Sequence, residues 1–191
     1  ATKDEYATKD EYATKDDNCE DNNSWVNTVA FTPDTISLSA NIFKPLSLVI
    51  QDTPLEYNEV LRLVICIGLQ LTALTTQKQG FTHLRPEDIT VINKDWYLIT
   101  NFENISAVTN KKISVTTPFV PDEFSAPELN NITTLPSDLH NTCSYYSIAM
   151  ICLRALGLTK DEVKKLQPSP LYFFLERCFS EKPEDRAYLL I

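Results

Sequence analysis

The sequence predicts a mostly helical fold that carries one small β-hairpin. The segment from residue 54 to 74 is apolar on all sides of a predicted helix, which is typical of a central, buried helix. Two further apolar segments, 145–156 and 171–179, are also expected to be helices. Short runs of β-branched and aromatic residues at 89–92 and 96–99 lie on either side of a turn and predict the hairpin.

Local signals fix where some of these elements begin. Thr53, Pro54 and Glu56 predict the start of the long helix, with Thr53 as its N-cap, Pro54 at its first position and Glu56 completing a capping box. The alternating residues 36–39 are expected to open the folded part. The polar stretch 104–122, which contains two prolines, is expected to be a loop.

Composition predicts one domain that follows a tail. With 191 residues and 43% hydrophobic content, the chain can form one sizeable core. Residues 1–33 are predicted to be a low-complexity acidic tail and linker, and residues 34–191 to be the domain. The tail repeats the unit ATKDEY. Residues 1–23 contain eight acidic and three basic residues, so they carry a charge of −5, more than half of the net charge of −9. A solvated, disordered tail is expected, with a recognition tail as the alternative.

No segment is predicted to cross a membrane or to direct secretion. The apolar stretch 61–74 is interrupted by Arg62 and Gln70 and is shorter than the roughly 20 residues that a bilayer requires. The first residues are polar and acidic, unlike a signal peptide. The cysteines are odd in number and lack metal-ligand spacing, which favours reduced thiols in the cytoplasm over disulfides or zinc. They are Cys19, Cys66, Cys143, Cys152 and Cys178.

Four short motifs stand in the order in which protein kinases carry them in the carboxyl-terminal half. FTHLRPED at residues 81–88 resembles the His-Arg-Asp catalytic loop, and NFE at 101–103 resembles Asp-Phe-Gly. SAPE at 125–128 resembles Ala-Pro-Glu, and CFSEKPEDR at 178–186 resembles the signature of the last helices. The resemblance implies a protein-kinase-like C-terminal lobe without the N-terminal lobe.

The resemblance lacks the groups that transfer phosphate. Phosphoryl transfer needs a carboxylate base, an Asn and an Asp that hold magnesium, and a glycine-rich loop. At the corresponding positions, His83 replaces the base, Asp88 replaces the Asn and Asn101 replaces the Asp that binds magnesium. Glu103 replaces the glycine of the Asp-Phe-Gly motif. The three glycines of the chain cannot form a G-x-G-x-x-G loop. We therefore expect a pseudokinase that is not an enzyme and has no cofactor or metal.

Two of these positions leave an alternative open. His83 has an ordinary pKa near neutrality and could act as a base, but a packed loop histidine is favoured. Asp88 could hold a metal, but next to the neutral Asn101 it is a poor magnesium ligand, so a polar surface residue is favoured.

Taken together, residues 34–191 are similar to a KIND domain, the kinase non-catalytic C-lobe domain of Spir actin nucleators, of a FERM- and PDZ-containing tyrosine phosphatase and of a Ras exchange factor. The similar segments are ISL at 36–38, PLE at 54–56, NFENIS at 101–106, FSAPEL at 124–129, and YSIAM and ALGL near 146 and 155. The resemblance implies an interaction module in the cytoplasm, associated with the cytoskeleton, whose partner is a formin tail or another cytoskeletal protein.

A second family remains open. The segments 85–88 and 183–186 are closer to true kinases than those of many KIND sequences. They leave open, as the alternative, a truncated, viral type of pseudokinase that inhibits a host kinase by mimicking its C-lobe.

Charge suggests how a partner is recognised. An acidic surface attracts a basic segment, so the predicted partner-binding residues are Asp122, Glu123, Glu176 and Glu181, with a solvated acidic face as the alternative. Neither nucleic acid nor a membrane is an expected partner. Glu128 and Arg186 correspond to the kinase ion pair that joins the Ala-Pro-Glu segment to the last helices, so we predict a structural ion pair.

Overall fold

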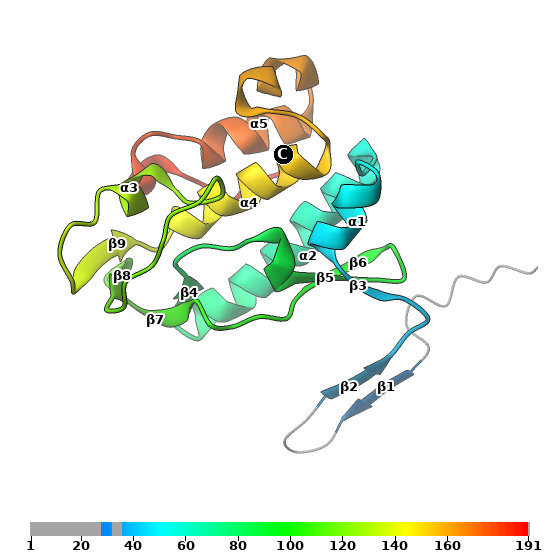
Figure 1. The fold of residues 1–191 in the computed structure, drawn as a ribbon, viewed down its shortest axis with the longest axis horizontal. Helices are drawn as coiled ribbons and strands as arrows, with labels where there is room; N and C mark the ends of the chain where they lie inside the picture. Colours follow the sequence, from blue (N-terminus) through cyan, green and yellow to red (C-terminus); the bar gives the residue numbers. More distant parts are fainter. Residues whose placement is uncertain (1–27, 32–35, 191) are drawn as a thin grey trace, which may run out of the picture.

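The structure, a computed structural model, describes residues 28–31 and 36–190 and has a mixed α/β fold (Figure 1). Two antiparallel sheets, of three and four strands, accompany the helices, and a two-stranded ribbon precedes them. The predicted mostly helical fold with a single hairpin is therefore wrong. Apart from residues 28–31, the predicted tail and most of its linker lie outside the described residues.

The three-stranded sheet contains the predicted hairpin. β5 (Ile89–Ile92) and β6 (Trp96–Ile99) pair in an antiparallel register, which confirms that prediction. Asn93 and Lys94 make the turn with positive φ angles of 50° and 70°, a conformation that Asn tolerates well. β3 (Phe43–Pro45), which the sequence analysis missed, pairs with the other edge of β5.

The four-stranded sheet was not predicted. Its strands lie in the order β4 (Gln79–Phe81), β7 (Ile105–Thr109), β8 (Lys112–Val115) and β9 (Ser137–His140). β1 (Thr28–Phe31) and β2 (Ile36–Ser39) form the separate two-stranded ribbon.

The first half of the predicted loop at 104–122 is instead a hairpin. Asn110 and Lys111 have φ angles of 52° and 62° and form a tight turn between β7 and β8. Ile113 and Val115 alternate inward while their neighbours are exposed, so this short strand does carry the period of a half-buried strand.

Helices form the other layer. The α-helices are α1 (Leu46–Asp52), α2 (Tyr57–Thr76), α3 (Pro127–Asn130), α4 (Cys143–Ala155) and α5 (Pro170–Cys178). Three 3-10 segments complete them: η1 (Pro86–Asp88), η2 (Lys160–Leu166) and η3 (Pro183–Asp185). The two apolar helices predicted near residues 145 and 171 are confirmed as α4 and α5.

The predicted start of the long helix is wrong by three residues. α2 begins at Tyr57, and its N-cap is Glu56. The capping box is formed by Glu56 and Glu59, because Glu59 Oε2 accepts a 2.7 Å hydrogen bond from the Glu56 N–H. Thr53 instead ends the preceding helix α1 as its C-cap.

α2 is buried along one side rather than all round. Its inward residues belong to the main core and include Val60, Leu63 and Ile67, whereas Ile65 and Leu69 are 51% and 67% exposed. By length and composition alone, α2 is long and apolar enough to cross a membrane. A core helix passes the same test, and α2 packs into the core.

The core lies between the helices and the three-stranded sheet. In Figure 1, α4 lies between α5 and α2, and the three contribute most of the buried side chains. The C-terminal segment closes over α2: a Cβ added at Gly68 would lie 2.7 Å from the Tyr188 ring, and the Tyr188 hydroxyl donates to the Val64 carbonyl.

Four cysteines are free thiols, as predicted. Cys143, Cys152 and Cys178 are buried and Cys66 is half-buried, whereas Cys19 lies outside the described residues. Burial raises the pKa of Cys143 and of Cys178 to about 12, so both thiols are protonated at neutral pH.

Candidate functional site

The loop between β4 and β5 brings the degenerate kinase positions together. His83 and Asp88 are each only 4% exposed, and Asn101 follows β6, the partner strand of β5. A packed histidine and a polar surface aspartate are the predictions from the sequence for these two positions. The structure agrees for His83, but Asp88 is buried.

Asp88 is a structural hub. Its Oδ2 accepts from the Arg85 N–H at 2.8 Å and its Oδ1 accepts from Asn101 Nδ2 at 2.8 Å. Asn101 Oδ1 in turn accepts from the N–H of Glu103, whose side chain is exposed. One carboxylate oxygen of Asp88 therefore caps η1, and the other holds it to the end of the hairpin.

His83 is buried without hydrogen-bond partners. Among the described residues, neither ring nitrogen has one, and the ring packs against Phe119 with 5.5 Å between centroids. Burial, and then the positive charge of Arg85, lower the pKa of His83. The imidazole is therefore neutral at physiological pH.

Asp122 is tied into the same region. Arg85 Nε lies 2.5 Å from Asp122 Oδ2, and Asp122 Oδ1 accepts from the Phe124 N–H and the Ser125 hydroxyl. Burial alone raises the pKa of Asp122, but these hydrogen bonds and Arg85 outweigh it and lower the pKa. Asp122 thus anchors the turn that leads into α3, and its charge is already partnered.

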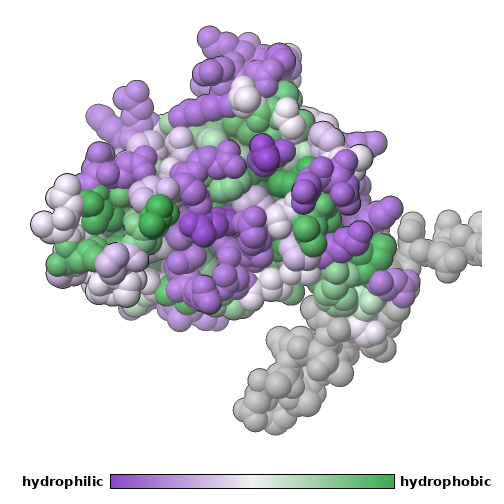
Figure 2. All heavy atoms as spheres, viewed as in Figure 1, coloured by the Kyte–Doolittle hydropathy of each residue, from purple (hydrophilic) through white to green (hydrophobic). Residues whose placement is uncertain are grey.

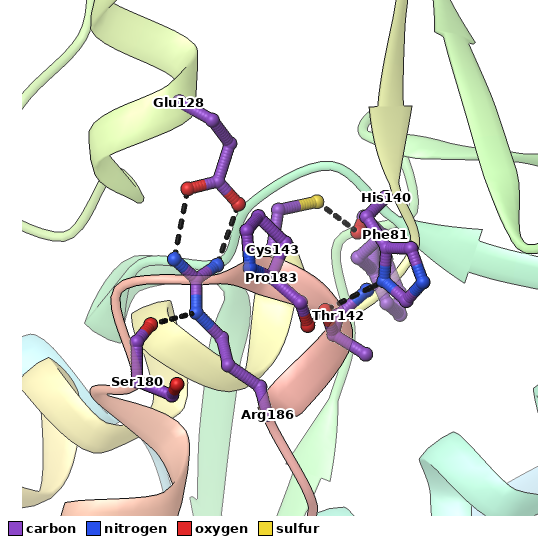
Figure 3. Close-up of polar contacts among 8 residues, drawn as sticks. All are labelled: Phe81, Glu128, His140, Thr142, Cys143, Ser180, Pro183 and Arg186. Carbon is purple, nitrogen blue, oxygen red and sulfur yellow. Dashed lines mark hydrogen bonds and ion pairs between the residues drawn. The ribbon is translucent and has the colours of Figure 1, made fainter.

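The predicted ion pair between Glu128 and Arg186 is present (Figure 3). Arg186 forms a fork, with Nη1 donating to Glu128 Oε1 at 2.5 Å and Nη2 to Oε2 at 2.9 Å. Its Nε donates to the Ser180 carbonyl, and its guanidinium lies 5.4 Å from the centre of the Tyr146 ring.

Further contacts surround this pair. Thr142 donates to the Pro183 carbonyl at 2.5 Å and hydrogen-bonds to His140 Nδ1, and the Cys143 thiol donates to the Phe81 carbonyl. Figure 3 shows these residues beside the fork. Together they tie α3, the start of α4 and the C-terminal segment to β4, which makes this a structural centre.

A cleft of about 370 Å³ lies next to the loop that joins β4 to β5, which we call the catalytic-loop region for its predicted resemblance. We call it the acidic cleft because two exposed carboxylates, Glu87 and Glu123, line it. Ser47, Ile50 and Gln51 of α1 form the facing wall, and Arg154 is the one cation at its edge within the described residues. Neither carboxylate has an ion-pair partner among residues 28–31 and 36–190.

Of the four predicted partner-binding residues, only Glu123 lines the acidic cleft. Asp122 is used internally. Glu176 is exposed on α5 and Glu181 is exposed just after it, and no described pocket joins them to Glu123. Glu87 was missed as a candidate. Its only signal in the sequence was its position between Pro86 and Asp88. The Glu87 side chain is exposed, whereas that of Asp88 is buried.

The face drawn in Figure 2 is covered mostly by hydrophilic residues, between which hydrophobic residues appear as separate patches. The aromatic residues differ in their exposure. Tyr97, Tyr146 and Phe174 are buried, whereas Trp96 and Phe173 are 48% and 47% exposed.

In comparisons with known proteins, no family model matches the chain and no curated protein is similar to it.

Proposed function

We propose that this domain is a non-catalytic interaction module that binds a basic segment of a partner protein. The KIND resemblance of the sequence supplies the partner class, a formin tail or another cytoskeletal protein, and with it a role in actin or cytoskeletal regulation in the cytoplasm. The proposal combines this resemblance with two features of the catalytic-loop region.

The first feature is that the degenerate catalytic positions serve the fold. Both oxygens of Asp88 accept internal hydrogen bonds, and His83 is neutral and packed under Phe119. A general base must reach the proton that it removes, and the His83 ring is buried. This supports a role that uses the surface of the domain rather than its former catalytic centre.

The acidic cleft is the observation that carries the proposal. Glu87 and Glu123 face the same cavity of about 370 Å³ without an internal ion pair in the described part of the chain. Exposed carboxylates near a concave surface raise the rate of encounter with a basic ligand, and added salt screens this attraction strongly. Apolar atoms in the cleft, such as those of Ile50, can then hold the complex.

Charge variants test the cleft. The doubly substituted Glu87→Lys, Glu123→Lys protein should associate about tenfold more slowly with a basic formin-tail peptide at low salt, and its rate should depend less on salt. The unfolding free energy should change by less than about 0.5 kcal/mol, because both residues are exposed. Stopped-flow fluorescence measures the rate, and urea unfolding measures the stability.

The matched control reverses the charges of Glu176 and Glu181, the two predicted partner-binding residues on and just after α5. We expect the peptide to associate with this variant at the wild-type rate. If only the Glu176 and Glu181 reversal slows association, the partner binds at α5 and the acidic cleft is the wrong site. If no basic peptide binds but the protein binds and inhibits an intact kinase, the mimic function replaces this one.

A nucleotide titration tests the non-catalytic part of the proposal. A ligand that binds only the folded state raises the melting temperature by mass action. ATP with magnesium should leave the melting temperature unchanged, and no labelled phosphate should be transferred to a protein substrate. A magnesium-dependent rise in melting temperature would count directly against the proposal.

A further inference from the structure

A second cavity lies on the other side of α1. It has a volume of about 320 Å³ and opens between α1, the three-stranded sheet and the first turn of α2. Its walls are largely apolar, formed by Ile42, Val49, Pro54, Leu55 and Val91. We call it the Tyr97 cavity, because the tyrosine also lines it.

The Tyr97 hydroxyl is a buried polar group without a partner. The residue is only 2% exposed, and its hydroxyl makes no hydrogen bond within the described residues. The backbone is fixed, because Tyr97 pairs with Val91 and its carbonyl accepts from Gln70 Nε2 at 2.9 Å. A buried, unpaired hydroxyl costs free energy, and phenylalanine would fill the same space without that cost. A group that hydrogen-bonds to the hydroxyl would remove this cost.

Carboxylates accompany this hydroxyl. Glu59 and Asp52 line the cavity, and Glu59 is the charged group that acts most strongly on Tyr97. One Glu59 oxygen caps α2, and the other has no partner among the described residues. The nearby cation Arg62 is already paired with Asp95.

Two lysines also line the cavity, beside its two carboxylates. Lys44 and Lys94 are exposed, so their ammonium groups can remain in water. Neither forms an ion pair within residues 28–31 and 36–190. The group best matched to the interior is therefore a hydrogen-bond donor with a positive charge on an apolar stem.

We infer that the Tyr97 cavity receives a lysine or arginine side chain of the basic partner segment. The aliphatic stem packs against the apolar walls, and the charged head reaches the Glu59 carboxylate and the Tyr97 hydroxyl. α1 separates this cavity from the acidic cleft: Val49 and Asp52 face one, and Ile50 and Gln51 face the other. A segment that crosses α1 can place basic residues in both. The inference rests on the proposed function for its partner, but the cavity can be tested alone.

The probe is N-acetyl-arginine methylamide, with N-acetyl-norleucine methylamide as the uncharged control, each titrated into the full-length ¹⁵N-labelled protein. The arginine probe should shift cavity amides saturably and bind about tenfold more tightly than norleucine, since a hydrogen-bonded charge adds that factor. Tyr97→Phe and Glu59→Gln should each weaken the arginine probe about five- to tenfold. Asp138→Asn, on β9 in the other sheet, should not.

Thermal melting separates a binding role from a structural one. Without a ligand, Tyr97→Phe should melt no lower than wild type, because it removes an unpaired hydroxyl. If Tyr97→Phe melts lower and binds the probe as tightly as wild type, the hydroxyl is a structural group and the inference is wrong. Equal affinity of the arginine and norleucine probes would also show that the inference is wrong.

Binding of the basic peptide distinguishes a failure of the Tyr97 cavity from a failure of the proposed function. If the peptide binds and depends on Glu87 and Glu123 but is unaffected by Tyr97→Phe, the proposed function stands and the Tyr97 cavity is not its subsite. If the arginine probe saturates the cavity but no basic peptide binds, the cavity is a cation site and the proposed function fails.

Discussion

The Glu128–Arg186 pair is the clearest case of a predicted interaction that serves stability. The Arg186 side chain is 0% exposed and that of Glu128 is 19% exposed, so removing the carboxylate leaves a buried guanidinium unpaired. Glu128→Gln should therefore lower the free energy of unfolding by about 3–5 kcal/mol, as measured by urea denaturation. Glu184→Gln, an exposed change in the same C-terminal segment, should stay within about 0.5 kcal/mol. A cost for Glu128→Gln that is no larger than this control would mean that the pair is not structural.

His83 makes stability depend on pH. Its pKa is lower in the folded protein than its ordinary value of 6.5, so the unfolded chain binds more protons at mildly acidic pH. The contribution of His83 to the unfolding free energy is complete above pH 6.5 and is lost as the pH falls through 6.5 toward the folded pKa. Asp122 affects stability in a separate pH window, because its pKa is lowered from an ordinary value of 3.8.

The His83→Gln variant isolates this effect. Between pH 7 and pH 5, wild type should lose unfolding free energy more steeply than the variant in paired urea titrations, since each unit of pKa difference is worth about 1.4 kcal/mol. Parallel curves for the two proteins would show that His83 does not titrate differently on folding.

At the scale of elements, Gln70 joins the long helix to the hairpin. From α2, its Nε2 donates to the Tyr97 carbonyl and its Oε1 accepts from the Ile99 N–H, both at 2.9 Å. Gln70→Ala leaves two backbone groups of buried residues unpaired and should lower the unfolding free energy by about 1–3 kcal/mol. Gln77→Ala, an exposed position at the end of α2, is the control in the same denaturation series. Equal stabilities of these two variants would contradict the role of Gln70.

Elements with a strong local pattern were predictable, and those defined by their partners were not. The apolar helices and the β5–β6 hairpin bury enough of their own residues to show a period. β3, β4 and β9 have only three or four residues each, and a strand of this length is specified by the neighbour with which it pairs. Gln70 and Arg62 looked like interruptions of an apolar segment, whereas both connect α2 to the hairpin region.

At the scale of the whole molecule, the N-terminal repeat should be dispensable for folding. Residues 1–23 offer little apolar surface to bury, because the repeat is dominated by charged and small polar residues. A chain that begins at residue 24 should keep its helicity and its cooperative melt, with a midpoint close to that of the full chain by circular dichroism. Loss of the cooperative transition would place the tail within the folded unit.

The candidate site was predictable only in part. The degenerate positions and the Glu128–Arg186 pair were predictable because each residue stands in a short motif that resembles a kinase motif, although the two residues of the pair are 58 positions apart. The acidic cleft joins Glu87 of η1, Glu123 and the wall of α1, and sequence spacing does not show that these segments meet. The internal role of Asp122 could not be predicted, because no motif links it to its partner Arg85.

The central claim is that the domain recognises a basic segment through negative charge. Its most direct test compares a formin-tail peptide with a copy in which every lysine and arginine is glutamine, using calorimetry with the full chain at low and at high salt. The basic peptide should bind more tightly at low salt, and its advantage should shrink as salt screens the attraction. Equal affinity of the two peptides at low salt, or no binding of either, would contradict the claim.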